Sequence, residues 1–81
     1  MNEQLKMYKV LRLAEAGGIW YHFTIVVNGA KFRTDAWFIE FGEGHDEKVR
    51  SIESRASREL CTRIRWKFPE FSLTSQFILV Y

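Results

Sequence analysis

The stretch "YHFTIVVNGAKFRTDAW", residues 21–37, decides the fold because Asn28 and Gly29 lie at its centre and aromatic residues lie on both arms. Both turn residues tolerate the positive φ that a two-residue hairpin turn requires, so the stretch predicts two antiparallel strands. Such a turn also fixes which residues face each other. On one face, the core face, the expected pairs are Val27 with Ala30, Ile25 with Phe32, Phe23 with Thr34, Tyr21 with Ala36 and Ile19 with Phe38.

The alternate residues of the hairpin form a second face, because successive side chains of a strand point to opposite sides of a sheet. The pairs expected there are Val26 with Lys31, Thr24 with Arg33, His22 with Asp35 and Trp20 with Trp37. A shift of the register by one residue would exchange the two faces. The assignment therefore depends on the turn being two residues long.

Residues 5–15 alternate between apolar and polar types and predict a half-buried strand. The residues on its apolar side are Leu5, Met7, Leu11 and Leu13. Lys9 is the one misfit on that side. An odd-length loop around residues 16–18 is needed to bring the apolar side to the core face. The residues that then join the second face are Tyr8, Val10 and Arg12.

Residues 46–67 change to the period of a helix that lies on a sheet. The apolar positions that recur at helical spacing are Val49, Ile52, Ala56, Leu60 and Ile64. Asp46 and Glu47 suit the start of this helix, and Pro69 prevents its continuation. Residues 71–81 contain the apolar run "FILVY" and predict a last strand.

These elements predict an α+β fold, with a four-stranded, mostly antiparallel sheet and one helix packed on one face. Residues 1–81 form a single domain, because a chain of this length has no room for a second core. A right-handed crossover through the helix makes the last strand parallel to the first strand or to the third. We prefer the place beside the first strand, which gives the spatial order 4-1-2-3, and the other edge is the alternative.

The composition limits the classes of function. Apolar residues make up 47% of the chain and aromatic residues 16%, which argues for a packed globule. The formal net charge is only +2, so a nucleic-acid signal must come from local clusters of charge. The single cysteine, Cys61, excludes an internal disulfide and suits a reducing compartment. The N-terminal sequence has no signal-peptide pattern and no run long enough to span a bilayer, so we expect a cytoplasmic protein that does not enter membranes.

The second face is the main candidate site. Two tryptophans, Trp20 and Trp37, are expected there, and an aromatic surface with arginines is typical of binding hot spots. The residues expected around them are Tyr8, Val10, Arg12, Val26, Lys31 and Arg33. The alternative interpretation is an ordinary cross-strand aromatic pair that stabilises the sheet.

Catalysis and metal binding are not expected. His22 opposite Asp35 suggests a dyad, with Thr24 nearby, but a flat sheet offers no water-excluding pocket, so we interpret the pair as structural. His45 has no second ligand beyond the neighbouring acids, and we expect it to be solvated, with no metal and no cofactor. We expect Cys61 to be a half-buried structural thiol.

The outer side of the predicted helix is basic. Arg55, Arg58 and Arg65 lie opposite its apolar stripe. A solvated helix face explains this pattern, and contact with phosphates or with an acidic protein is the alternative. Interleaved acids weaken the case for nucleic acid.

The chain carries no P-loop and no G-x-G-x-x-G. Its plan of three strands, a helix and a strand without a catalytic set resembles small phage-encoded inhibitors, including anti-CRISPR and other anti-defence proteins. That resemblance implies a protein that blocks a host enzyme by occupying its surface. Our first hypothesis is such a non-enzymatic protein-binding module, the second is nucleic-acid binding by the second face, and the third is a homodimer. The candidate binding residues are Tyr8, Arg12, Trp20, His22, Lys31, Arg33, Trp37, Arg55 and Arg58.

Overall fold

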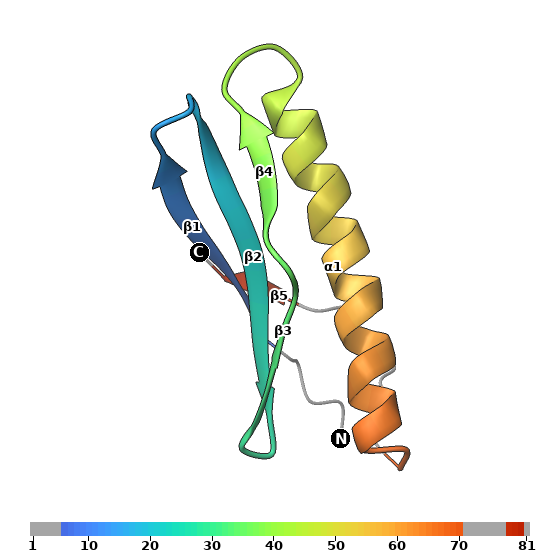
Figure 1. The fold of residues 1–81 in the computed structure, drawn as a ribbon. Coiled ribbons are helices and arrows are strands. Elements are labelled where there is room, and N and C mark those ends of the chain that lie inside the picture. The colour runs from blue at the N-terminus through green and yellow to red at the C-terminus, as the bar shows by residue number, and fades with distance from the viewer. Residues whose placement is uncertain (1–5, 71–77, 81) are drawn as a thin grey trace.

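The computed structural model describes residues 6–70 and 78–80, which form one sheet and one helix. The elements are β1 (Lys6–Ala14), β2 (Gly18–Val27), β3 (Ala30–Arg33), β4 (Trp37–Glu40), α1 (His45–Lys67) and β5 (Ile78–Val80). The helix lies along one side of the sheet (Figure 1), which confirms the predicted α+β class. The parts of the predicted strands at Leu5, at residues 71–77 and at Tyr81 lie outside the described residues.

The order of the sheet is β3-β2-β1-β5, and β4 also pairs with β2. Together β3 and β4 therefore take the place of the single third strand that the sequence predicts. The last strand, β5, is parallel to β1, with Lys6 opposite Ile78. This pairing confirms the preferred edge and the spatial order 4-1-2-3. Within the described part of the chain, no helix combines the length and the apolar content needed to span a bilayer.

The two turns of the antiparallel strands have the predicted lengths. Asn28 and Gly29 connect β2 to β3 with φ of 49° and 79°, the left-handed values that this turn requires. The register follows the prediction from the Val27–Ala30 pair to the Thr24–Arg33 pair. Residues 15–17 form the three-residue loop between β1 and β2. This odd length places Tyr8, Val10 and Arg12 on the second face, as predicted.

Beyond Arg33 the register shifts by one residue. Tyr21 is opposite Trp37 and Trp20 is opposite Phe38, so two residues, Asp35 and Ala36, lie against the single residue His22. This arrangement is a β-bulge. The predicted pairs of Trp20 with Trp37, Tyr21 with Ala36 and Ile19 with Phe38 are therefore wrong. His22 lies against the bulge that contains Asp35 instead of in a regular pair with it. The Asn28-Gly29 turn therefore sets the pairing of β2 with β3 but not the pairing of β2 with β4, which lies beyond the bulge.

Thr34 holds the bulge in place through two hydrogen bonds with Phe23. The amide of Thr34 donates to the carbonyl oxygen of Phe23, at 3.0 Å. The amide of Phe23 donates to the Oγ1 atom of Thr34, also at 3.0 Å, so a hydroxyl replaces the carbonyl of a regular ladder. Thr34 is only 3% exposed. The side chain thus satisfies a buried donor that the bulge would otherwise leave unpaired.

The shift in register divides the side chains between two faces. Trp37 lies on the helix face, where its ring is 6.1 Å from that of Phe23. Phe38 lies on the opposite side, which we call the open face. The described residues of the open face are Lys6, Tyr8, Val10, Arg12, Ala14, Gly18, Trp20, His22, Thr24, Val26, Lys31, Arg33, Phe38 and Glu40.

The core lies between the sheet and the predicted stripe of the helix. The helix side chains in this core are Val49, Ile52, Ala56, Leu60 and Ile64, as expected. From the sheet, the core takes Met7, Tyr21, Phe23, Ile25, Val27 and Ile39. The helix ends where the amide of Phe68 donates to the carbonyl oxygen of Ile64, at 2.8 Å, just before Pro69.

Lys9, the polar misfit on the core side, forms an ion pair with the helix. Its Nζ atom is 3.1 Å from Oε1 of Glu53, and the two side chains are 9% and 19% exposed. The ammonium also lies 5.8 Å from the centre of the Tyr21 ring. Since the helix packs against β2, β3 and β4, Leu11 and Leu13 of β1 share its face but stay exposed.

The bulge predicts different effects for two substitutions of Thr34. Thr34→Val keeps the shape but removes the acceptor for the amide of Phe23, so the free energy of unfolding should fall by about 1–3 kcal/mol. Thr34→Ser keeps the acceptor and loses one buried methyl group, at a cost of about 0.8 kcal/mol. Urea unfolding measures both changes, and hydrogen exchange should show loss of protection at Phe23 in the valine variant alone. Equal protection of that amide in the two variants would contradict this role of the hydroxyl.

Candidate binding surface

Six of the nine predicted binding residues lie together on the open face. These six are Tyr8, Arg12, Trp20, His22, Lys31 and Arg33. The strand pairing brings Arg12 beside Trp20 on one side of β2, and Arg33 beside Thr24 on the other. The prediction that Trp37 belongs to this face is wrong, because the side chain lies half-buried against the core. Arg55 and Arg58 are exposed on the helix and do not belong to this surface.

Trp20 and Phe38 form the aromatic centre of the open face. Their ring centroids are 5.2 Å apart, and the ring planes are inclined by 50°. The ring of Phe38 also covers Gly18, where an added Cβ atom would approach it to 2.6 Å. The sequence analysis did not place Phe38 on this face. The signal for it is Gly18 at the start of β2, because a residue without a side chain leaves room for the ring of Phe38.

Aliphatic and tyrosine side chains extend this centre. Tyr8 is 45% exposed and Val26 is 56% exposed, and Val10 is exposed as well. Thr24 lies between them but is buried, since its partners across the sheet are Tyr8 and Arg33, whose longer side chains flank it. The open face therefore offers apolar contacts on β1 and β2 rather than one isolated ring.

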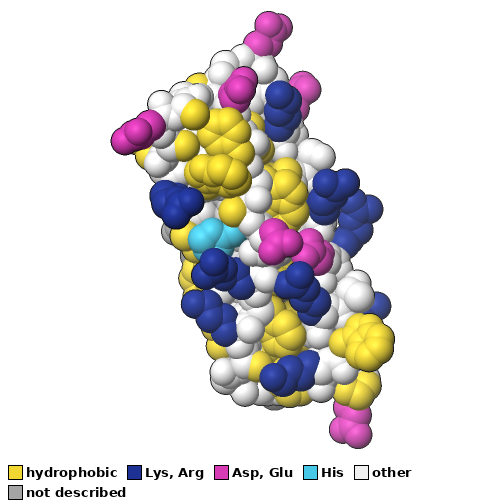
Figure 2. All heavy atoms as spheres, in the orientation of Figure 1, with side chains coloured by type: hydrophobic (Ala, Val, Ile, Leu, Met, Phe, Trp, Pro, Cys, Tyr) yellow, Lys and Arg dark blue, Asp and Glu magenta, His cyan; other side chains and the backbone are white. Residues whose placement is uncertain are grey.

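Basic side chains surround His22. Burial lowers the pKa of His22 below its ordinary value of 6.5, and the positive charges of Arg33, Lys31 and Arg12 lower it further. The ion pairs among the described residues are Lys9 with Glu53 and Arg63 with Glu59, so neither neutralises this cluster. In the view of Figure 2, Lys and Arg side chains gather around a His over the strands, with Asp and Glu side chains beside them in the middle of the view and hydrophobic side chains above. The surface is both apolar and positively charged.

The His22–Asp35 dyad is not formed. No hydrogen bond or ion pair joins the two side chains in the described structure, and Asp35 lies in the bulge. Residues 6–70 and 78–80 also contain no group of three side chains that would hold a metal ion. Cys61 is half-buried and free, as predicted.

His45 is ordered by its neighbours, which corrects the expectation of a solvated side chain. Its Nδ1 atom is 2.9 Å from the carbonyl oxygen of Glu40, and its Nε2 atom is 2.9 Å from the hydroxyl of Tyr21. Because a carbonyl can only accept, Nδ1 donates to Glu40, and in the neutral imidazole Nε2 accepts from the hydroxyl of Tyr21. The ring of Phe41 stacks on the imidazole at 5.8 Å. His45 thus connects the start of α1 to β2 through Tyr21 and to β4 through Glu40.

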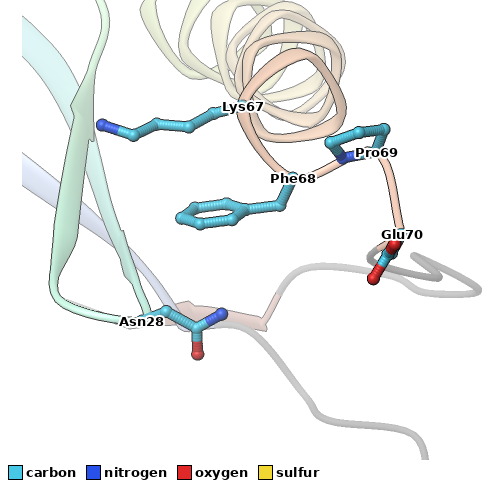
Figure 3. A pocket seen from close by; sticks show the side chains of 5 residues that line it. All are labelled: Asn28, Lys67, Phe68, Pro69 and Glu70. Atoms are coloured by element: carbon cyan, nitrogen blue, oxygen red, sulfur yellow. The ribbon is translucent and has the colours of Figure 1, made fainter.

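Two further features lie at the other end of the helix. Trp66 is 85% exposed, and sequence reasoning did not identify it. A shallow pocket of about 380 Å³ lies between the β2–β3 turn and the end of α1. Asn28, Lys67 and Phe68 are among its lining residues, and the last two point from the helix toward the hairpin (Figure 3). This pocket is separate from the open face.

Comparisons with protein-family models, with curated proteins and with solved structures each give no match.

The lowered pKa of His22 predicts how the stability of the protein depends on pH. Because the folded state lowers its pKa, the unfolded state binds the proton more tightly, and stability should fall as pH decreases through 6.5. His22→Gln should remove this part of the pH dependence in urea unfolding. In an NMR titration, Arg33→Gln should move the pKa of His22 back toward 6.5, whereas Arg58→Gln, on the helix, should leave it unchanged. Equal effects of the two arginine variants would contradict the proposed origin of the shift.

Proposed function

We propose that this protein is a non-enzymatic binding module whose open face contacts a partner protein. The observation that carries the proposal is the open face itself, in which Trp20, Phe38 and Tyr8 lie among cations that form no ion pair with another described residue, on the side of the sheet away from the helix. Aromatic residues and arginine at the centre of a surface are the types that dominate binding energy in protein interfaces. Trp20 and Phe38 lie on neighbouring strands, which holds them in place before a partner binds.

The shape of the surface supports blocking rather than catalysis. None of the described pockets is lined by residues of the open face. Enzymes and small-molecule sites use concave pockets that exclude water. A sheet face that lines none of the described pockets is suited to covering a surface of another protein.

The finer form of the proposal is an inhibitor that occupies a surface of a host enzyme or defence complex. Its support is the resemblance in plan to small phage-encoded inhibitors, including anti-CRISPR proteins, together with the flat apolar and basic surface. In this form the rigid β2 strand presents Trp20 and His22 to the target, and no chemical step is required of the chain.

Nucleic-acid binding is the second candidate function. It is favoured by one observation, the group of Arg12, Lys31 and Arg33 without carboxylate partners among the described residues. Such a group attracts phosphates and releases counterions when it binds them.

A matched pair of charge substitutions tests which surface binds proteins. Peptides selected from a random library for binding to the whole protein should contact the open face. Val26→Glu should then weaken the binding by about tenfold or more, because it places a charge in the apolar part of the interface. Ser54→Glu adds the same charge on the exposed side of α1 and should leave the binding unchanged. Isothermal titration calorimetry measures both affinities.

The reverse result would contradict the proposal. If Ser54→Glu abolished binding and Val26→Glu did not, the helix would be the interface. If light scattering gave a dimer that Val26→Glu dissociates, a second copy of the chain would cover the open face instead of a partner protein.

A further inference from the structure

We infer that the partner of the open face is an acidic protein surface, one that presents carboxylates around an apolar centre. This inference rests on the proposed function and names the chemistry of the partner. The cations of the open face lie on both sides of the central strand. Arg12 is on β1, next to Trp20, and Lys31 and Arg33 are on β3, next to Val26 and Thr24.

The spacing of the strands sets the size of the complementary surface. Neighbouring strands are about 4.8 Å apart, so β1 and β3 flank β2 at a separation of about 10 Å. Arg12 is opposite Trp20 and Arg33 is opposite Thr24, so the two arginines are also offset by about 13 Å along β2. A partner that places carboxylates with this diagonal spacing would engage Arg12 and Arg33 together, with its apolar side chains over Trp20 and Val26. Arginine is suited to this because its planar group binds a carboxylate through two hydrogen bonds.

Two acidic residues lie close to this surface. Glu40 is opposite Gly18 at the far end of β4, and Asp35 is in the bulge. Neither is among the causes that shift the pKa of His22, which arise from burial and from three cations. Arg33, Lys31 and Arg12 therefore act together on His22, and their charges are available to a partner of opposite charge.

The arrangement of the apolar groups favours a protein over a single-stranded nucleic acid. Bases stack on aromatic faces that are free. Trp20 is half-buried, and its ring is packed against Phe38 at a tilt of 50°. The exposed apolar groups nearby include two valines, Val10 and Val26, which offer no ring for a base. Aliphatic and tyrosine contacts inside a basic rim match the apolar centre and polar rim of a protein interface.

Three defined probes test the inference on the whole protein. The first is a peptide of repeated Glu-Asp-Leu, the second is its amide counterpart of repeated Gln-Asn-Leu, and the third is oligothymidine. The acidic peptide should bind about tenfold or more tightly than the amide peptide, because its carboxylates meet the cations of β1 and β3. NMR shifts should map to the open face, and added salt should weaken the binding.

Variants that each remove one positive charge, on the open face or on the helix, show which cations contact the acidic peptide. Arg33→Gln and Lys31→Gln should each weaken binding of the acidic peptide by about fivefold, as for charge-assisted contacts in an interface. Arg58→Gln removes one exposed charge from the helix and should leave the affinity unchanged. Circular dichroism confirms that each variant is folded before its affinity is compared.

The possible failures have different meanings. Equal affinity for the acidic and amide peptides, with shifts on the open face, would overturn the acidic partner and leave the proposed binding face intact. Tighter binding of oligothymidine than of the acidic peptide would overturn the inference in favour of nucleic acid. Shifts confined to α1 would contradict the proposed function itself, and no binding of the acidic peptide would overturn the inference.

Discussion

The register of β2 is the constraint on which the rest of the structure depends. This central strand pairs with β1, β3 and β4, so an error in its register would exchange core and surface residues throughout the sheet. The Asn28-Gly29 turn sets that register at one end. The Thr34 hydroxyl stabilises the single shift that follows. Together they determine that Phe23 and Trp37 face the helix while Trp20 and Phe38 face away from it.

Much of this fold could be predicted from the sequence, because its signals are local. The turn, the odd loop at residues 15–17 and the five buried positions of α1 each follow from a short pattern. The bulge does not. It depends on one extra residue in a segment, residues 34–36, whose composition is compatible with a continuous strand, and on a buried hydroxyl that completes the ladder. The cost of leaving Phe23 unpaired is evident only once the partner strand is in place.

The candidate site, like the fold, could be predicted from the sequence up to the bulge but not beyond it. The residues before the bulge, among them His22, Lys31 and Arg33, share a face as expected, while Trp37 and Phe38 exchange places. The role of Lys9 also depends on tertiary structure. A lysine on the core side of a strand has no explanation in its neighbours along the chain, but Glu53 reaches it from the helix. Such a partly buried pair favours one placement of helix on sheet, because displacement would leave two charges without partners.

The pairing of β5 with β1 has a consequence for the order of folding. The hairpins of β1, β2 and β3 connect strands through short loops and close quickly, whereas Lys6 must find Ile78 from the opposite end of the chain. We therefore expect β5 to join the sheet last. Until it does, the backbone groups along the outer edge of β1 lack their final partners. A newly made chain would present an unprotected strand edge during this interval, and other chains can pair with such an edge. Prompt formation of this long-range pair therefore protects the edge of β1 from other chains.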